Sequence, residues 1–222
     1  MRRLLVGLAL FVLILGAGVI WTATPGTDEA YDLARARIAA AAEDDTRVLR
    51  FDDLPQLGTL PPEIATLDRL IRIDLRGTKV EDITALADLD GLKFLSLHST
   101  LVRDIGPLAG LPSLEMLDIG ETWVADIAPL VELPALRRLD LGHTQLRSLE
   151  PATRIPTLEW INLHGGYAID GSAEHYQTLV ETGRTVNNGR AFREDYQPDW
   201  LYRTRVRIGR IVHRARLGLN AR

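Results

Sequence analysis

The sequence contains no cysteine among its 222 residues. This absence excludes a disulfide framework, a thiolate metal site, a cysteine nucleophile and a lipidated cysteine anchor. Three common catalytic motifs are missing as well: a GxSxG nucleophile elbow, a glycine-rich phosphate loop and an HExxH pair. We therefore expect a chain that is not an enzyme and that holds neither a cofactor nor a metal ion.

Positive charge is scarce in most of the chain and concentrated at one end. The net charge is -4, but residues 199–222 hold seven arginines against the single acid Asp199. That segment carries +6, which leaves -10 on residues 1–198. An acidic body followed by a basic tail is a charge pattern typical of an interaction segment.

The N-terminal residues form one long apolar run. Leu4 to Trp21 contains no charge, and 18 helical residues span about 27 Å, enough to cross a bilayer core. Because Arg2 and Arg3 precede the run and an acidic stretch follows it, residues 1–24 are predicted to form a signal anchor with the N-terminus inside. The expected location is a bacterial inner membrane, single-pass, with the remaining chain on the periplasmic or extracellular side. The alternative is secretion after signal cleavage, with Gly16-Ala17-Gly18 as the best candidate site.

A 22-residue period follows this segment. Leu70, Leu92, Leu114, Leu136 and Leu158 each begin a similar phrase, and a looser copy begins at Val48. Apolar residues recur at phrase positions 1, 4, 6, 11, 14, 17 and 20. Positions 4 and 6 alternate as in a half-buried strand, and positions 14, 17 and 20 have the spacing of a tight helical turn. Stacked units would share one apolar column, which predicts an α/β solenoid over residues 46–168 with short parallel strands on its concave face and helical or 3-10 turns on its convex face.

The phrase LxxLxLxxTxVxDIxPL resembles bacterial leucine-rich-repeat domains of the internalin-like, 22-residue class, and LPPEIATL resembles their LPxEI variant. The resemblance implies a binding module. The ninth position, usually asparagine in that family, departs from it here: Thr78, Thr100, Thr122, Thr144 and Gly166. We expect the threonines to form a ladder that binds turn backbone, and the recurring Asp82, Asp104 and Asp126 to accept backbone amides where a turn or helix begins.

Each end of the stack is predicted to carry a cap, since a bare solenoid end exposes core and sheet edge. Residues 27–45 are expected to form an N-terminal helix that starts after Thr27 and has an apolar face of Ala30, Leu33, Ile38 and Ala41. Residues 169–198 are expected to form a C-terminal cap. It would contain a helix over 172–181, stopped by Gly183, and a last strand over 184–186.

The strand residues between the buried ones are predicted to line the concave face. They stand at three phrase positions, given in chain order. Position 3 holds Arg50, Arg72, Phe94, Met116, Arg138 and Trp160; position 5 holds Asp52, Asp74, Ser96, Asp118, Asp140 and Asn162; position 7 holds Leu54, Arg76, His98, Gly120, Gly142 and His164.

Large apolar side chains beside arginines on this face are typical of interface hot spots, which makes Phe94, Met116 and Trp160 candidate contacts. The alternative is that they pack against one another or against a cap. The acidic and amide residues at position 5 would suit a basic peptide or sugar hydroxyls, although a structural role is the competing interpretation. A shared metal ion is not expected, because His98 and His164 lie three strands apart at about 4.8 Å each. His143 with Asp118 or His164 is the remaining metal candidate, and we interpret these side chains as surface polar groups.

The basic tail over residues 199–222 has amphipathic spacing. On a helix, Trp200, Ile208, Ile211 and neighbouring apolar residues would share an arc of about 120°. The arginines that would flank this arc are Arg203, Arg207, Arg210 and Arg214. This composition favours contact with a membrane surface. Contact with the acidic body of the same chain or with a partner protein, a disordered end, and nucleic-acid binding are the alternatives, and export argues against the last.

The sequence as a whole predicts a membrane-tethered, exported and monomeric module that binds a protein or peptide, and no nucleic acid, on its concave face. The predicted contacts span five repeats: Arg72, Asp74, Arg76, Phe94, Ser96, His98, Met116, Asp118, Arg138, Asp140, Trp160, Asn162 and His164. Two other functions stay open. The solenoid could be a spacer between the anchor and a membrane-binding tail, or Trp160 with the Asp/Asn column could bind a glycan.

Overall fold

The computed structural model describes residues 26–165 and 172–187. The predicted anchor over residues 1–24 and the basic tail over residues 199–222 lie outside this part, as do residues 169–171 and 188–198 of the predicted cap over residues 169–198. Within the described residues, no helix combines the length and apolar character needed to cross a membrane.

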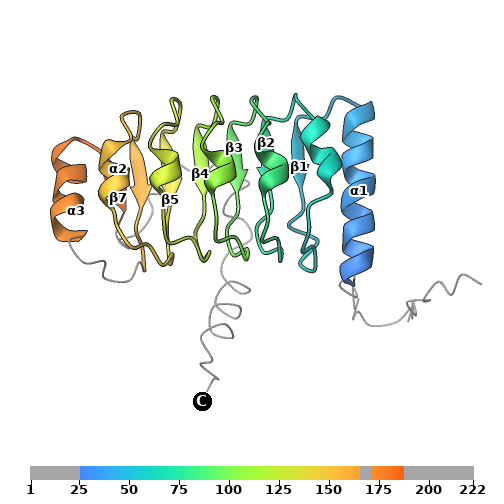
Figure 1. Ribbon diagram of the computed structural model, residues 1–222, viewed down its shortest axis with the longest axis horizontal. Coiled ribbons are helices and arrows are strands. Elements are labelled where there is room, and N and C mark those ends of the chain that lie inside the picture. Colours follow the sequence, from blue (N-terminus) through green and yellow to red (C-terminus); the bar gives the residue numbers. More distant parts are fainter. Residues whose placement is uncertain (1–25, 166–171, 188–222) are drawn as a thin grey trace, which may run out of the picture.

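Seven short strands form one parallel sheet in the order in which they occur along the chain. The strands are β1 (Val48–Arg50), β2 (Arg72–Asp74), β3 (Phe94–Ser96), β4 (Met116–Asp118), β5 (Arg138–Asp140), β6 (Trp160–Asn162) and β7 (Thr185–Asn187). Figure 1 shows them as a row, with α1 (Thr27–Glu43) at one end and α3 (Ser172–Glu181) at the other. The result is a solenoid that grows by one strand per repeat.

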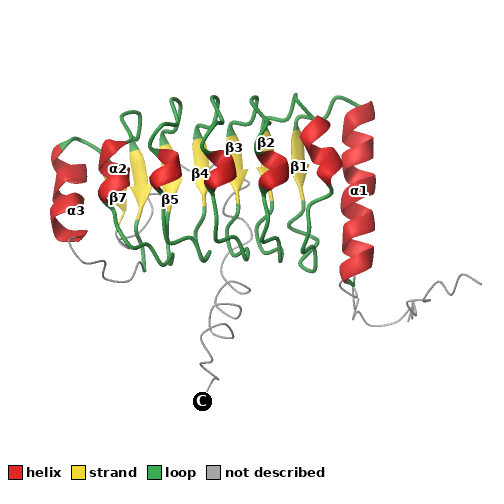
Figure 2. Cartoon of the chain, viewed as in Figure 1, coloured by secondary structure: helices red, strands yellow, loops and turns green. Residues whose placement is uncertain are grey.

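A helical turn connects each strand to the next. These turns are η1 (Pro62–Thr66), η2 (Thr84–Leu86), η3 (Gly106–Leu108), η4 (Ala128–Leu130) and α2 (Glu150–Arg154). Figure 2 shows the helical turns as one layer and the strands as a second layer behind them. The apolar core lies between the two layers, as the expected strand and 3-10 turn pattern requires.

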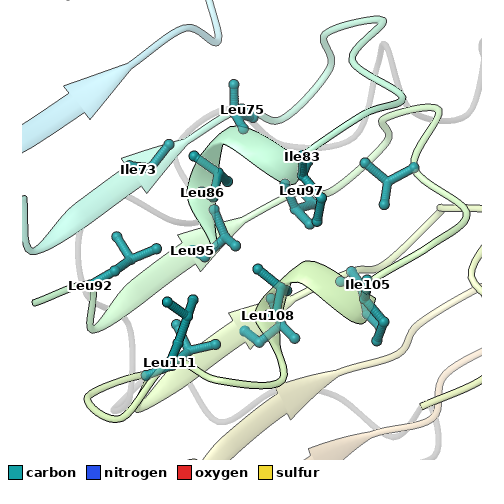
Figure 3. Close-up of a cluster of buried hydrophobic side chains, with 14 of the residues drawn as sticks. Ile73, Leu75, Ile83, Leu86, Leu92, Leu95, Leu97, Ile105, Leu108 and Leu111 are labelled. Atoms are coloured by element: carbon teal, nitrogen blue, oxygen red, sulfur yellow. The ribbon is translucent and has the colours of Figure 1, made fainter. Parts of the chain in front are cut away.

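The strand register follows the sequence period. From β2 to β6, each residue pairs with the residue 22 positions later: Arg72 with Phe94, Phe94 with Met116, Met116 with Arg138 and Arg138 with Trp160. Equivalent side chains therefore stand in rows about 4.8 Å apart across the sheet. The core columns stack in the same way, and Figure 3 shows strand residues such as Leu95 beside turn residues such as Leu108.

The first repeat is two residues longer than the 22-residue repeats between β2 and β6, and its predicted register is wrong. Val48 pairs with Arg72 and Arg50 pairs with Asp74, a separation of 24 residues. Leu49 and Phe51 supply the buried alternation. Position 3 of this repeat is therefore Val48 and position 5 is Arg50. Leu54, predicted to line the concave face, is instead buried in the core.

Two side-chain ladders hold the turns in place. The four threonine hydroxyls each donate to the carbonyl three residues earlier, at 2.6 to 2.7 Å, as in Thr100 to Leu97. Asp82, Asp104 and Asp126 each accept the backbone N–H two residues later, at 2.7 to 2.8 Å, where η2, η3 and η4 begin. Both predicted ladders are confirmed as backbone contacts.

Helix α1 covers the β1 end of the core. Its buried residues are Ala30, Ala34, Ile38 and Ala41. Leu33, predicted on that face, is 43% exposed, because the spacing of four residues selects Ala34 in its place. Gly26, and not Thr27, is the N-cap residue. At the other end, Leu179 of α3 is buried, and the Arg184 guanidinium donates to the carbonyl of Ile155 at 2.8 Å.

Candidate binding face

The outer side of the sheet, away from the core, carries three rows of side chains. We call this surface the strand face. Its aromatic row is Arg72, Phe94, Met116, Arg138 and Trp160; its carboxylate row is Asp74, Ser96, Asp118, Asp140 and Asn162; its histidine row is Arg76, His98, Gly120, Gly142 and His164. Every residue predicted to contact a partner belongs to one of these rows.

The aromatic row is the part of the strand face that combines apolar groups with partial exposure. All five of its residues are half-buried, neither covered by the core nor fully solvated. The Arg72 guanidinium lies 4.7 Å from the centre of the Phe94 ring, within cation–π range. The row is therefore a half-buried surface of aromatic, thioether and guanidinium groups.

The carboxylate row lies deeper than predicted. Asp74, Ser96 and Asp118 are buried, so these three predicted contacts lie beneath the surface that a partner would touch. The reason is that side chains from the neighbouring repeats and from the histidine row cover them. The Arg76 guanidinium, for example, lies 3.0 Å from the buried Asp74 carboxylate and 3.3 Å from Asp52.

The carboxylate row organises the turns that follow the strands. Asp118 and Asp140 accept the N–H of Gly120 and Gly142 at 3.0 and 2.9 Å, and Asn162 accepts the N–H of His164 at 3.1 Å. The row is also linked across strands, because Ser96 donates to Asp118 at 3.2 Å and Asn162 donates to Asp140 at 2.8 Å. Its main role is therefore to hold the histidine row in a fixed position.

Burial changes the acidity of this row. Burial raises the pKa of Asp74 to about 6, although Arg76 acts in the opposite direction. The pKa of Asp140 is also raised, first by burial and then by repulsion from Asp118. Burial and mutual repulsion thus oppose the ionisation of these carboxyl groups.

His98 is the cation that lies beside Asp118. Its Nδ1 lies 3.4 Å from Asp118, and its Nε2 lies 3.9 Å from Glu121. Burial alone would lower the pKa of His98, but Asp118, Glu121 and Asp140 outweigh burial and raise it to about 9. The ring also lies against Gly120, where an added Cβ would come within 2.7 Å of Nδ1. Glycine at that position is therefore what lets the imidazole lie flat on the next repeat.

The residue after each histidine-row position adopts a left-handed backbone conformation. The five are Gly77, Ser99, Glu121, His143 and Gly165, all with φ between 54° and 73°. A side chain at such a position costs on the order of 1 kcal/mol, so the three non-glycine residues are strained. Ser99 donates to Glu121 at 2.7 Å, which links two of them. Ser99 and Glu121 were not predicted from the sequence, although the 22-residue period aligns them with Gly77 and Gly165.

Two further histidines, His143 and His164, pack at the β6 end. The His143 and His164 rings meet edge to face with centroids 5.1 Å apart, and His143 also covers Gly165. Within residues 26–165 and 172–187, no group of three or more His, Asp or Glu side chains is arranged to hold a metal ion.

A second half-buried tryptophan, Trp123, was also missed from the sequence. It lies in the turn after β4, outside the three rows, with the Arg103 guanidinium 5.2 Å from its ring.

Comparison with known proteins gives a fold and no closer relative. No family model and no curated protein matches the sequence. Among solved structures, an internalin C2 from Listeria monocytogenes is 18% identical with a TM-score of 0.50, over 71% of this chain and 84% of that one. An internalin (inlF) from the same organism is 19% identical with a TM-score of 0.47, over 67% of this chain and 54% of that one, so this chain matches about half of its length. The likeness to internalin C2 shows an internalin-like leucine-rich-repeat fold.

Proposed function

We propose that this chain is a binding module that takes a protein or peptide partner on the strand face, which we expect to be concave. The observation that carries the proposal is the aromatic row, which aligns Phe94, Met116 and Trp160 with two arginines on five adjacent strands. Aromatic, methionine and arginine side chains are enriched where protein interfaces hold most of their binding energy. Four strand spacings make the row about 19 Å long, which suits a peptide segment or a helix.

Rigidity supports the same proposal. The row stands on backbone that is fixed by the parallel sheet, and the turns beside it are held by Asp118, Asp140 and Asn162. A surface that is ordered before binding loses little conformational entropy when a partner docks. We propose no chemical reaction at this surface.

We further propose that the module is exported and tethered to a membrane by the apolar run over residues 4–21. The support is the sequence of that run and the arginines before it. A reporter that is active only outside the cytoplasm, fused at residue 222, tests the orientation. Activity places the repeats outside, and an inactive but intact fusion overturns the proposed topology.

The Trp160→Ala variant tests the binding proposal in a crosslinking pulldown from cells that naturally make the protein. We expect this variant to lose capture of the main partner by about 30-fold, the effect of a hot spot worth roughly 2 kcal/mol. Trp123→Ala is the matched control, since it removes a half-buried tryptophan outside the strand face. Circular dichroism of both variants checks that the solenoid stays folded.

Undiminished capture by Trp160→Ala would overturn strand-face binding. That result would favour the alternative in which the solenoid is only a spacer between the anchor and the basic tail.

A further inference from the structure

We propose that the basic segment over residues 199–222 docks on the strand face of its own chain, at the carboxyl ends of β3, β4 and β5. There it would compete with the external partner. This inference rests on the proposed function, because it names an intramolecular occupant for the same surface. Three features of the described residues carry it: surplus charge, adjacent apolar groups and the point where the described chain leaves the sheet.

The first feature is an excess of negative charge where these strands end. Asp118, Glu121 and Asp140 surround the single imidazolium of His98. Side-chain exposure is 16% for Glu121 and 38% for His98, so the cluster opens to the surface. Burial and then repulsion from Asp118 raise the pKa of Asp140. A guanidinium placed here would supply the missing positive charge and relieve that repulsion.

The second feature is an apolar surface next to the charge. Met116 precedes Asp118 by two residues on β4, and Trp160 precedes Asn162 by two residues on β6, so each pair shares one side of the sheet. Two residues of strand span about 7 Å, which matches the length of an arginine side chain. Arginine has an apolar stem and a charged head, so the stem fits the aromatic row while the head reaches the carboxylates. The partner class that fits is therefore an arginine-rich segment with apolar residues of its own.

The third feature is that such a segment lies within reach. Residues 199–222 carry seven arginines together with Trp200, Ile208, Ile211 and Val212. The last described strand, β7, ends at Asn187 and pairs in parallel with β6, so its carboxyl end lies at the same sheet edge as the charge cluster. From β7 to β3 is four strand spacings, or about 19 Å. Residues 188–198 can span about 36 Å when extended.

Linkage in one chain strengthens the contact. A short flexible connection gives an effective concentration in the millimolar range, so a weak electrostatic contact would be occupied most of the time. The proposal therefore predicts that the free strand face is largely covered until a partner displaces the segment.

Disulfide trapping tests the proposal directly, because the chain has no cysteine of its own. In the full chain, His164→Cys at the exposed end of β6 is combined with Arg210→Cys, and the intramolecular disulfide is followed on non-reducing gels under mild oxidation. The control combines Arg210→Cys with Glu132→Cys, an exposed position after η4 on the helical side of the core. We expect the His164 pair to form at least about 10-fold faster, and the difference to shrink at high salt, where screening weakens the contact.

Two substitutions that neutralise carboxylates without changing their shape identify the site. Glu121→Gln and Asp140→Asn keep the hydrogen bonds to Ser99 and Gly142 but remove two negative charges. Added to the His164/Arg210 pair, they should reduce trapping to the control rate. Neutralising the segment by Arg203→Gln, Arg207→Gln and Arg214→Gln in the chain without added cysteines should raise capture of the external partner several-fold.

Equal rates of disulfide formation for the two cysteine pairs would overturn the proposal. A rate for the His164 pair that changes neither with salt nor with the neutral substitutions would overturn it as well. If trapping stays at the control rate while the chain's tail is protected from protease by phosphatidylglycerol vesicles, the segment binds a membrane surface instead. None of these trapping readouts uses the external partner, so their failure would leave strand-face binding intact. Failure of the Trp160→Ala test, in turn, would not alter the trapping result.

Discussion

His98 shows how one residue of the strand face depends on the next repeat. Its imidazole contacts Asp118 and Glu121, both contributed by the following 22-residue unit, and it lies on the backbone of Gly120. The raised pKa of His98 means that the folded state binds its proton more tightly than the unfolded chain does. Stability from this contact is therefore fully present below the unfolded pKa of about 6.5 and is lost as the pH rises through about 9.

The His98→Gln variant tests this sign. We expect the wild type to be more stable than the variant at pH 6, by on the order of 1 kcal/mol, because His98 is 38% exposed and water screens the ion pairs. The difference should vanish by about pH 10. Urea unfolding midpoints between pH 6 and pH 10 measure it, with His164→Gln in the same row as the control. If the urea midpoints of the wild type and of His98→Gln differ by the same amount at every pH, the charged contact is contradicted.

At the scale of elements, helix α1 closes the β1 edge, which would otherwise be an open template for strand pairing. Arg37 is the main polar link. Its guanidinium donates to both carboxylate oxygens of Asp53 at 2.8 Å, donates to the Arg50 carbonyl, and lies 5.6 Å from the centre of the Phe51 ring. The hydrogen bonds from Arg37 hold the pKa of Asp53 below its ordinary value. One side chain thus joins the cap to β1 and to the turn after it.

We expect Arg37→Met to loosen this cap without unfolding the stack. The variant keeps an apolar stem but loses the paired hydrogen bonds, which should cost about 1 kcal/mol. Hydrogen exchange of the β1 amides should accelerate at least several-fold, whereas β4 amides stay protected.

Arg35→Met is the matched control for this prediction, because it makes the same substitution on the same helix. The Arg35 side chain is 63% exposed and pairs with Glu63 of η1, so it has no hydrogen bond to β1 or to Asp53. We expect β1 exchange in this control to stay close to that of the wild type. Equal acceleration in β1 and β4 of Arg37→Met would show that Arg37 stabilises the whole stack and not the cap.

The sequence predicted the repeating elements and the terminal helices over residues 27–45 and 172–181, but it mispredicted the register of the first copy. The strands β2 to β6 and both ladders follow from the period, because the same residue types recur at the same positions of every unit. The first copy was misaligned because its 24-residue length breaks the period, and the apolar alternation alone had to set the register. The alternation of apolar and polar residues also placed Asp74 and Ser96 on the correct side of the sheet. It did not predict that both side chains are buried, since their burial comes from neighbouring repeats. The left-handed turns at Ser99 and Glu121 carry no local signal, because neither residue favours that conformation.

At the scale of the whole molecule, contacts join each repeat mainly to its neighbours, so the solenoid resembles a one-dimensional array. Such an array should tolerate the loss of one complete unit. Deleting residues 93–114 joins Leu92 to Glu115 and lets β2 pair with β4 in the native register, because Leu92 and Leu114 occupy the same phrase position. We expect this variant to fold cooperatively, with a smaller free energy of unfolding and a smaller urea m-value, since less surface is buried.

The matched control deletes one residue fewer, 94–114, and leaves Lys93 in place. This shifts every later side chain by one position, and a one-residue shift in a strand turns its core residues outward. We expect the control to lose most of its cooperative transition in far-UV circular dichroism during urea unfolding, whereas the 22-residue deletion retains it. Similar transitions for both deletions would mean that the stack is held by general apolar collapse and not by the 22-residue register, and the alignment of the aromatic row would then lose its basis.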